Sequence, residues 1–239
     1  MTHEELLLQV RNLYLEAREP QFFYDKRHQA ISRCTSHSIS SEFEDLLAQY
    51  CYELIKEKSI GKDEEIQIFI DPQMTFPDLD LKNLSGKKTF LFRPDIVIVK
   101  NKEIVALLDA KTDLGFKKST YMDMIKHTNS VVGYLVGKNA HFTPRTKQPK
   151  VLFTISNKIK LTYFVASSKW ISKSYPIPDN EINKDYAYVN IFFLSAGAKD
   201  KNGHLNNYDN VEVGKNGVLL NKESILAFDS FILDAVNNQ

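Results

Sequence analysis

The chain has 239 residues, of which 43% are hydrophobic and 26% charged, and its formal net charge at pH 7 is +1. This composition is that of a globular protein with a substantial core, and the length suits one domain spanning residues 1–239. It contains no apolar run near the ~18 residues of a membrane span and no basic segment of a signal peptide at its start, so we expect no membrane contact. The isolated cysteines, Cys34 and Cys51, argue against a zinc site or a disulfide framework and favour a cytoplasmic location.

The first quarter of the chain predicts two amphipathic helices. The first covers residues 2–17, where apolar residues recur at helical spacing and Thr2 and Glu5 form a capping box. The second covers residues 39–57 and carries a longer apolar stripe. We expect the first helix to have a packing or subunit-contact role, because it carries no reactive side chains in a recognisable pattern.

The middle of the chain predicts a strand followed by a β-hairpin. Residues 66–70 nearly alternate between apolar and polar and end at an Asp-Pro pair, which is typical of a strand and its stop. Residues 96–99 and 104–108 are two apolar runs rich in β-branched side chains, separated by a polar break. Such runs indicate hairpin strands that are buried on both faces of a sheet. The segment between the first strand and the hairpin, residues 73–88, is expected to be a loop.

The second half of the chain predicts further strands and two more helices. A helix over residues 119–136 would cross over the sheet, and a helix over residues 222–236 would close the chain. The strands expected between them cover residues 151–155, 160–167 and 187–194. Together these elements predict an α/β fold, with a mixed central β-sheet flanked by helices on both faces.

Charged residues stand at the open end of the predicted hairpin, with Asp95 before its first strand and Asp109 and Lys111 at the end of its second. Side chains alternate along a strand, so Asp109 and Lys111 share a face. If residues 101–103 form a three-residue loop, Asp95 lies directly opposite Asp109 and points the same way. A shift of one residue in the register would turn Asp95 to the other face.

Two carboxylates this close repel each other unless a positive charge lies between them. A divalent cation with oxygen ligands, Mg²⁺ or also Mn²⁺, would balance them. A lysine beside such a cation can orient or deprotonate a water molecule. The alternative interpretation is an exposed hairpin end with ordinary solvated charges, which is common for such a short motif.

The order Pro94-Asp95 followed by Asp109-Ala110-Lys111 resembles the signature of the PD-(D/E)xK nuclease superfamily, which includes most type II restriction endonucleases. The resemblance implies a restriction-endonuclease-like core and Mg²⁺-dependent hydrolysis of phosphodiester bonds in double-stranded DNA. It also implies that the two aspartates and the Ala110 carbonyl hold the metal, while Lys111 positions or deprotonates the attacking water. By the same analogy, the chain is expected to act as a homodimeric type II restriction endonuclease.

Members of this superfamily usually have a helix before the hairpin that donates a glutamate to the metal site. The predicted helix over residues 39–57 stands in that place. By helical-wheel angle Glu44 falls nearer its buried stripe than Glu42 does. We therefore expect Glu44 to be the third metal ligand, with Glu42 as the second choice. Alternatively, both glutamates are simply favourable charges near the start of a helix.

The segment 138–150 is the most basic loop predicted in the chain. It carries Lys138, Arg145, Lys147 and Lys150 and no acidic residue. Such a loop is suited to binding the phosphate backbone of DNA, and we predict that role for these four residues. The alternative is a solvated surface loop.

Two other functions remain open from the sequence. A repair, recombination or mobile-element nuclease would use the same aspartates and Lys111 but recognise DNA structure rather than sequence. A non-catalytic DNA-binding or protein-binding module of the same fold would have no need of these three side chains. Cleavage of methylated and unmethylated plasmid separates a restriction enzyme from a structure-specific one.

Overall fold

The computed structural model describes residues 1–13, 40–58, 65–76, 91–112, 118–142, 149–167, 179–195, 198–199, 205–206 and 220–237. The helices of these regions are residues 3–13, α2 (Ser40–Lys58), α3 (Lys118–Leu135), α4 (Asp179–Asp185) and α5 (Lys222–Asn237). The strands are β1 (Ile66–Ile70), β2 (Met74–Thr75), β3 (Leu91–Phe92), β4 (Ile96–Lys100), β5 (Glu103–Lys111), β6 (Asn139–Phe142), β7 (Val151–Ile155), β8 (Leu161–Ser167), β9 (Val189–Ser195), β10 (Ala198–Lys199) and β11 (Leu205–Asn206).

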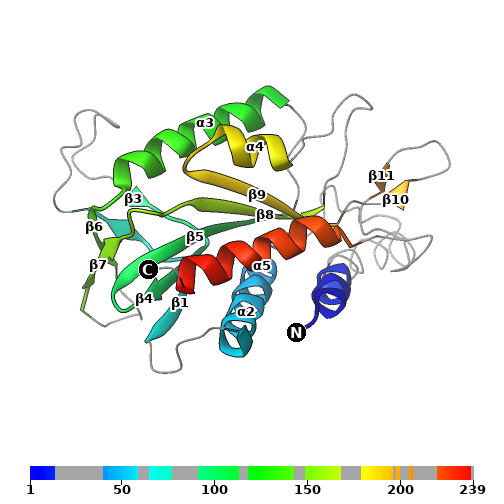
Figure 1. Ribbon diagram of the computed structural model, residues 1–239, viewed down its shortest axis with the longest axis horizontal. Coiled ribbons are helices and arrows are strands. Elements are labelled where there is room, and N and C mark those ends of the chain that lie inside the picture. The colour runs from blue at the N-terminus through cyan, green and yellow to red at the C-terminus, as the bar shows by residue number, and fades with distance from the viewer. Residues whose placement is uncertain are drawn as a thin grey trace, which may run out of the picture.

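Nine of the described strands form one mixed sheet, and β10 and β11 form a separate small pair. The central part of the nine-stranded sheet runs in the order β1, β4, β5, β8 and β9. Neighbouring strands are antiparallel from β1 to β5 and parallel from β5 to β9. The first residues of β5 also pair with β7, from which β6, β2 and β3 continue the sheet. Figure 1 shows α3 and α4 on one face of the sheet and α2, α5 and the N-terminal helix on the other. The predicted α/β class, with a mixed sheet and helices on both faces, is therefore confirmed.

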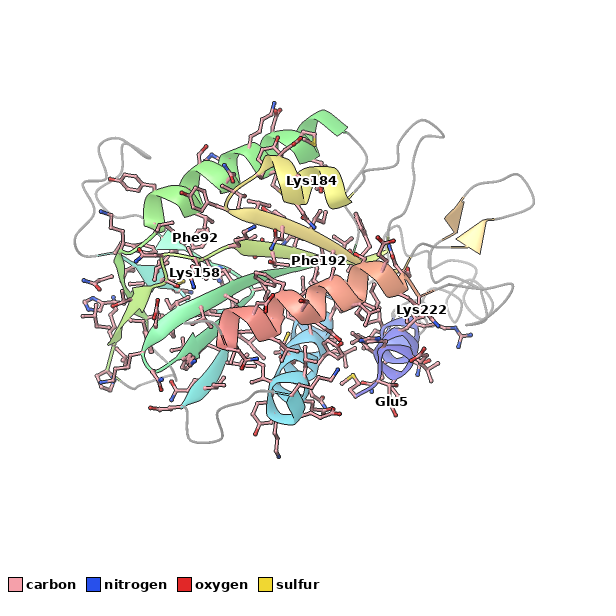
Figure 2. The ribbon with its side chains drawn as sticks, in the orientation of Figure 1. Glu5, Phe92, Lys158, Lys184, Phe192 and Lys222 are labelled. Carbon is pink, nitrogen blue, oxygen red and sulfur yellow. The ribbon has the colours of Figure 1, made fainter. Side chains whose placement is uncertain are left out.

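Each face of the sheet has its own hydrophobic core, because the central strands are buried on both sides. All residues of β4 are buried, which explains why its first four residues, 96–99, are a continuous apolar run. On one face Phe192 of β9 packs against Phe228 of α5, with ring centroids 5.7 Å apart (Figure 2). On the other face Ile125 and Val132 of α3 are fully buried against the sheet. No helix among the described residues combines the length and apolarity that a bilayer span requires.

The predicted capping box is present at the start of the N-terminal helix. The Thr2 backbone N–H donates to Glu5 Oε2 at 2.7 Å, and the Glu5 backbone N–H donates to Thr2 Oγ1 at 3.1 Å. The described helix covers residues 3–13, and the rest of the predicted helix, residues 14–17, lies outside the described residues. Its packing role is confirmed, because its buried leucines join the core beneath α2 and α5.

Six short elements were not predicted from the sequence, namely strands β2, β3, β6, β10 and β11 and helix α4. Strand β2 lies in the predicted loop of residues 73–88, and β6 lies in the predicted basic loop of residues 138–150. Only Ala140 and Phe142 are buried along β6, so its alternating pattern is too short to stand out from a loop. Helix α4, with seven residues, is likewise below the length at which periodicity is informative.

The predicted three-residue loop of the central hairpin is wrong. Lys100 pairs with Glu103, which leaves a two-residue turn of Asn101 and Lys102. Both turn residues have positive φ angles, 49° and 66°, and such turns match the twist of hairpin strands. The turn is also tied to the preceding segment, because the Asn101 N–H donates to the Glu65 carbonyl at 3.0 Å.

A β-bulge restores the register that places the site. Strand β5 carries one extra residue, Val105, opposite the junction between two paired stretches of β4. Beyond the bulge Ile96 pairs with Leu108, which brings Asp95 beside Asp109. The predicted opposition of the two aspartates is therefore confirmed, although the loop that was used to predict it is wrong. The shorter turn and the extra residue offset each other.

Candidate active site at the end of the central hairpin

Acidic residues from neighbouring strands meet at one end of the sheet. The backbone N–H of Asp71, just after β1, donates to the Asp95 carbonyl at 2.7 Å. The backbone N–H of Asp95, just before β4, donates to Asp109 Oδ1 at 3.3 Å. Asp109 of β5 in turn pairs with Tyr163 of β8. Because directly opposed residues point to the same face, the sheet gathers these side chains into one row.

Lys111 lies between the two aspartates of the predicted metal site. Its Nζ atom is 3.3 Å from Asp95 Oδ2 and 3.3 Å from Asp109 Oδ2. The backbone N–H of Ala110 also donates to Asp95 Oδ2, at 2.8 Å. The side chains of Lys111, Asp95 and Asp109 are 32%, 22% and 18% exposed, so the group is half-buried but open to water. The structure therefore brings together the three residues of the predicted motif.

The pKa values of these groups reflect burial and crowding of like charges. Burial, followed by the negative charge of Asp109, raises the pKa of Asp95, even though Lys111 and the Ala110 N–H oppose this shift. Burial alone would lower the pKa of Lys111, but the charges of Asp109 and Asp95 outweigh it and raise that pKa. Lys111 is therefore held as an ammonium ion that partly balances the two carboxylates.

Glu44 is the glutamate of α2 that faces this group. Burial, followed by the charges of Asp95 and Asp71, raises the pKa of Glu44 to about 7. Glu42 is exposed, and its carboxylate accepts a hydrogen bond from its neighbour Ser41 at 3.3 Å. The helical-wheel argument thus selects the glutamate whose charge reaches Asp95, while its role as a ligand stays a prediction. We call Glu44, Asp95, Asp109 and Lys111 the carboxylate–lysine cluster.

The donor atoms of this cluster suit a hard cation. Among the described residues no three His, Cys, Asp or Glu side chains are gathered as a ready metal-binding group. Lys111 stands between the two aspartates. However, the three carboxylates and the Ala110 carbonyl are all oxygen donors, which Mg²⁺ and Mn²⁺ prefer. Burial, followed by the charges of neighbouring carboxylates, raises the pKa values of Glu44 and Asp95. A divalent cation would oppose both effects, because it stabilises the charged carboxylates. The residues therefore fit Mg²⁺ in donor type and in charge.

Sequence reasoning missed Tyr163, which is buried beside Asp109. Its Oη atom lies 2.7 Å from Oγ1 of Thr128, so it links the row of site residues to α3. Burial chiefly, with the charges of Asp109 and Asp95, raises the pKa of Tyr163 to about 12. The strand that carries Tyr163 was predicted, but its place beside β5 was not. Knowing the order of the strands would have revealed it.

Sequence reasoning also missed the ion pair of Arg93 and Asp71 next to the cluster. Arg93 immediately precedes the Pro94-Asp95 motif, and its guanidinium contacts both carboxylate oxygens of Asp71. The available signal was the position of Asp71 at the end of the first predicted strand. An antiparallel pairing of that strand with the hairpin would have placed Asp71 beside Asp95.

Of the four residues predicted to bind DNA, the structure describes two, and neither lies at the cluster. Lys138 and Lys150 are exposed, and Arg145 and Lys147 lie outside the described residues. The two lysines flank β6 and β7, and β7 pairs with the first residues of β5. Asp109 lies six residues beyond Glu103, the first residue of β5, and at ~3.3 Å per residue these two residues are roughly 20 Å apart. The DNA-binding role of these residues stays a prediction.

Comparisons with known proteins place no further restraint on this site. No protein-family model matches the chain, and neither a curated protein nor a solved structure matches it. Its function must therefore be argued from the carboxylate–lysine cluster itself.

Proposed function

We propose that the chain is a Mg²⁺-dependent endonuclease that hydrolyses phosphodiester bonds of double-stranded DNA on a restriction-endonuclease-like core. One observation carries this proposal. The carboxylates of Asp95 and Asp109, from the two strands of one hairpin, both lie 3.3 Å from the ammonium of Lys111. The element order α2, β1, β4, β5 supports the proposal, because it is the helix, strand and hairpin order implied by the resemblance to PD-(D/E)xK nucleases.

Bound by Glu44, Asp95, Asp109 and the Ala110 carbonyl, Mg²⁺ or Mn²⁺ would polarise the phosphate and stabilise charge on the leaving oxygen. The protein itself supplies the geometry. The paired strands of the hairpin fix both aspartates. Glu44 approaches from α2, which covers the face of the sheet opposite to α3. This arrangement holds the donors before any ligand arrives, which lowers the cost of organising the site.

Lys111 is the basic residue of the cluster, and its amine can accept a proton from water once it is neutral. Two opposing influences set its pKa, since burial lowers it and the two carboxylates raise it. When the carboxylate charges are balanced, burial prevails and Lys111 releases its proton more readily. The neutral amine would then orient or deprotonate the attacking water as a general base.

The cellular role that we propose is a type II restriction endonuclease acting as a homodimer, by analogy with the superfamily. The test is incubation of the purified chain with methylated and unmethylated supercoiled plasmid, in Mg²⁺, in Mn²⁺ and in a chelator. We expect discrete fragments from unmethylated plasmid only, and only with a metal ion. Light scattering of the same sample measures the oligomeric state, and a monomer would contradict the homodimer.

Other outcomes select the alternatives when branched and flapped duplexes are added to this test. Cleavage of branched or flapped duplexes, whatever their methylation, would indicate a structure-specific nuclease. DNA binding without cleavage in either metal would indicate a non-catalytic module. A folded wild-type chain that neither binds nor cuts DNA would refute the proposal altogether.

The basic segment around β6 provides the proposed contact with the DNA backbone. Neutralising Arg145 and Lys147 together should weaken binding of every sequence. It should also reduce the slope of log affinity against log salt by about 0.9 per lost contact. An unchanged slope would move the DNA-binding face elsewhere.

A further inference from the structure

Arg93 lies two residues before Asp95 and has no role in the chemistry described above. Its Nε and Nη2 groups donate to the two carboxylate oxygens of Asp71, each at 2.5 Å. Both side chains are about half exposed, at 53% and 50%. Solvent-exposed ion pairs contribute little to stability, so the fold itself gives no strong reason for this paired geometry.

The backbone holds Asp71 and Asp95 in a fixed relation to each other. Strands β1 and β4 pair up to Ile70 and Ile96, and the Asp71 N–H then bonds to the Asp95 carbonyl at 2.7 Å. Asp71 has a φ of 52°, in the left-handed region that aspartate tolerates better than most residues. The ion pair is therefore anchored at the mouth of the carboxylate–lysine cluster.

The guanidinium of Arg93 is also within electrostatic reach of the cluster. Its hydrogen bond with Asp71 chiefly raises its pKa, and the charges of Glu44 and Asp95 raise it further. Among the described residues of this region, four carboxylates, those of Glu44, Asp71, Asp95 and Asp109, face the two cations Arg93 and Lys111. A polyanionic substrate is repelled by such an excess, so a cation at the mouth is needed to receive it.

Guanidinium binds carboxylate and phosphate with the same planar, two-pronged geometry. We propose that Arg93 is a phosphate-binding residue of this site and that Asp71 is its partner in the free protein. On substrate binding the guanidinium exchanges the Asp71 carboxylate for a backbone phosphate at the mouth of the cluster. This inference rests on the proposed nuclease function and adds a substrate-binding residue to it.

The test measures binding of a fluorescein-labelled DNA duplex to the full chain over a range of salt concentrations, in a chelator so that no cleavage occurs. Arg93→Ala should raise Kd about tenfold at low salt, since it removes a charged hydrogen-bonding group. It should also reduce the salt slope by about 0.9, the value for one phosphate. Arg93→Lys should keep the slope but recover only part of the affinity, because a lysine binds phosphate as a point charge.

A matched control removes a cation far from the cluster. Lys56→Ala, an exposed position in the last turn of α2, should leave both Kd and slope near their wild-type values. Thermal unfolding of each variant checks that the fold is intact, and the exposed positions of Arg93 and Asp71 favour this.

The exchange of partners has a signature of its own in Asp71→Asn. With its competitor gone, Arg93 should bind DNA several-fold more tightly than in the wild type. In an Arg93→Ala background the same Asp71→Asn change should bring a much smaller gain, so the two effects should not add. Equal gains in both backgrounds would overturn the exchange.

The outcomes separate this inference from the proposed function. A wild-type chain that binds and cuts DNA, with an unchanged salt slope in Arg93→Ala, overturns the role of Arg93 alone. A wild-type chain that neither binds nor cuts DNA overturns the proposed function and this inference together.

Discussion

Two polar clusters of this protein hold buried or half-buried carboxylates in opposite ways. Asp229 of α5 is 5% exposed, and each of its oxygens has its own partner. The Tyr50 hydroxyl donates to Oδ1 at 2.5 Å, and His3 Nε2 is hydrogen-bonded to Oδ2 at 2.8 Å. This Asp229 network joins the N-terminal helix, α2 and α5. The carboxylate–lysine cluster instead holds three carboxylates around a single ammonium.

The difference is one of charge balance, because Asp229 has a partner for each oxygen whereas the carboxylate–lysine cluster has more carboxylates than cations. A buried polar network whose groups are all satisfied rigidifies the fold. Carboxylates gathered without enough positive charge raise one another's pKa, as Asp95 and Glu44 show, and they make the metal-free fold less stable. Perturbed groups of this kind concentrate at functional sites. Substitutions in the two clusters should therefore affect different properties.

Asp109→Asn should give the largest effect on activity. Losing a carboxylate that holds the metal should cost several kcal/mol of transition-state stabilisation, or on the order of 10³-fold in cleavage rate. The melting temperature without metal should stay the same or rise, because a like charge is removed from beside Asp95. Plasmid nicking and thermal unfolding measure the two effects. Retention of wild-type activity in this variant would end the metal-site proposal.

Lys111→Ala should give a smaller loss, roughly 10²-fold in the cleavage step, because general base catalysis contributes about that much. DNA binding in a chelator should be nearly unchanged. Lys111→Arg should not restore the rate, since an arginine side chain stays protonated. Single-turnover cleavage of pre-bound DNA measures the chemical step directly, and near wild-type turnover by the arginine variant would assign Lys111 a purely electrostatic role.

Asp229→Asn should reverse the pattern and reduce stability rather than activity. The amide cannot accept from both Tyr50 and His3, so a buried group loses its partner at a cost of about 1–3 kcal/mol. For a chain of this length each kcal/mol corresponds to about 2–4 °C in Tm. The rate of the folded protein should stay close to that of the wild type. A normal Tm with reduced cleavage would invert the assignment of the two clusters.

The elements predicted correctly from the sequence are the ones with long periodic patterns. Helices α2, α3 and α5 lie within a residue or two of their predicted bounds, because their apolar stripes repeat several times. Strands β2 and β6 were missed because two to four residues hold too little periodicity. The turn of the hairpin was also wrong, since local residue preferences do not reveal that a bulge later in β5 will offset it.

The site shows the same limit. Asp95, Asp109 and Lys111 were placed by alternation within a single hairpin, and Glu44 by its angle on a single helix. By contrast, Tyr163 and the Arg93–Asp71 pair depend on which strands are neighbours, and the order of strands is a property of the whole fold. A cluster of basic residues in the sequence likewise does not tell at which end of the sheet it will lie.

The smallest effects should distinguish Glu44 from Glu42, its matched control on the same helix. Glu44→Ala should reduce cleavage more than Glu42→Ala, because the carboxylate of Glu44 is close enough to Asp95 for the two charges to interact. The reverse order, measured on the same plasmid, would assign the third ligand to Glu42. Without metal, Glu44→Gln should also alter how stability depends on pH.

The direction of that pH effect follows from the two pKa values of Glu44, about 7 in the folded protein against an ordinary value of 4.5. Below pH 4.5 the group is protonated in both states, and the stabilisation from its raised pKa is fully present. As pH rises through about 7 that stabilisation is lost, because the folded state must ionise a carboxyl beside Asp95. Glu44→Gln avoids this loss, so its Tm should exceed that of the wild type at pH 8 but not at pH 5. Solvent around the partly exposed carboxyl screens the repulsion, so we expect about 1 kcal/mol, or about 2–4 °C. An equal difference in Tm at both pH values would show that the charge of Glu44 is not what strains the metal-free site.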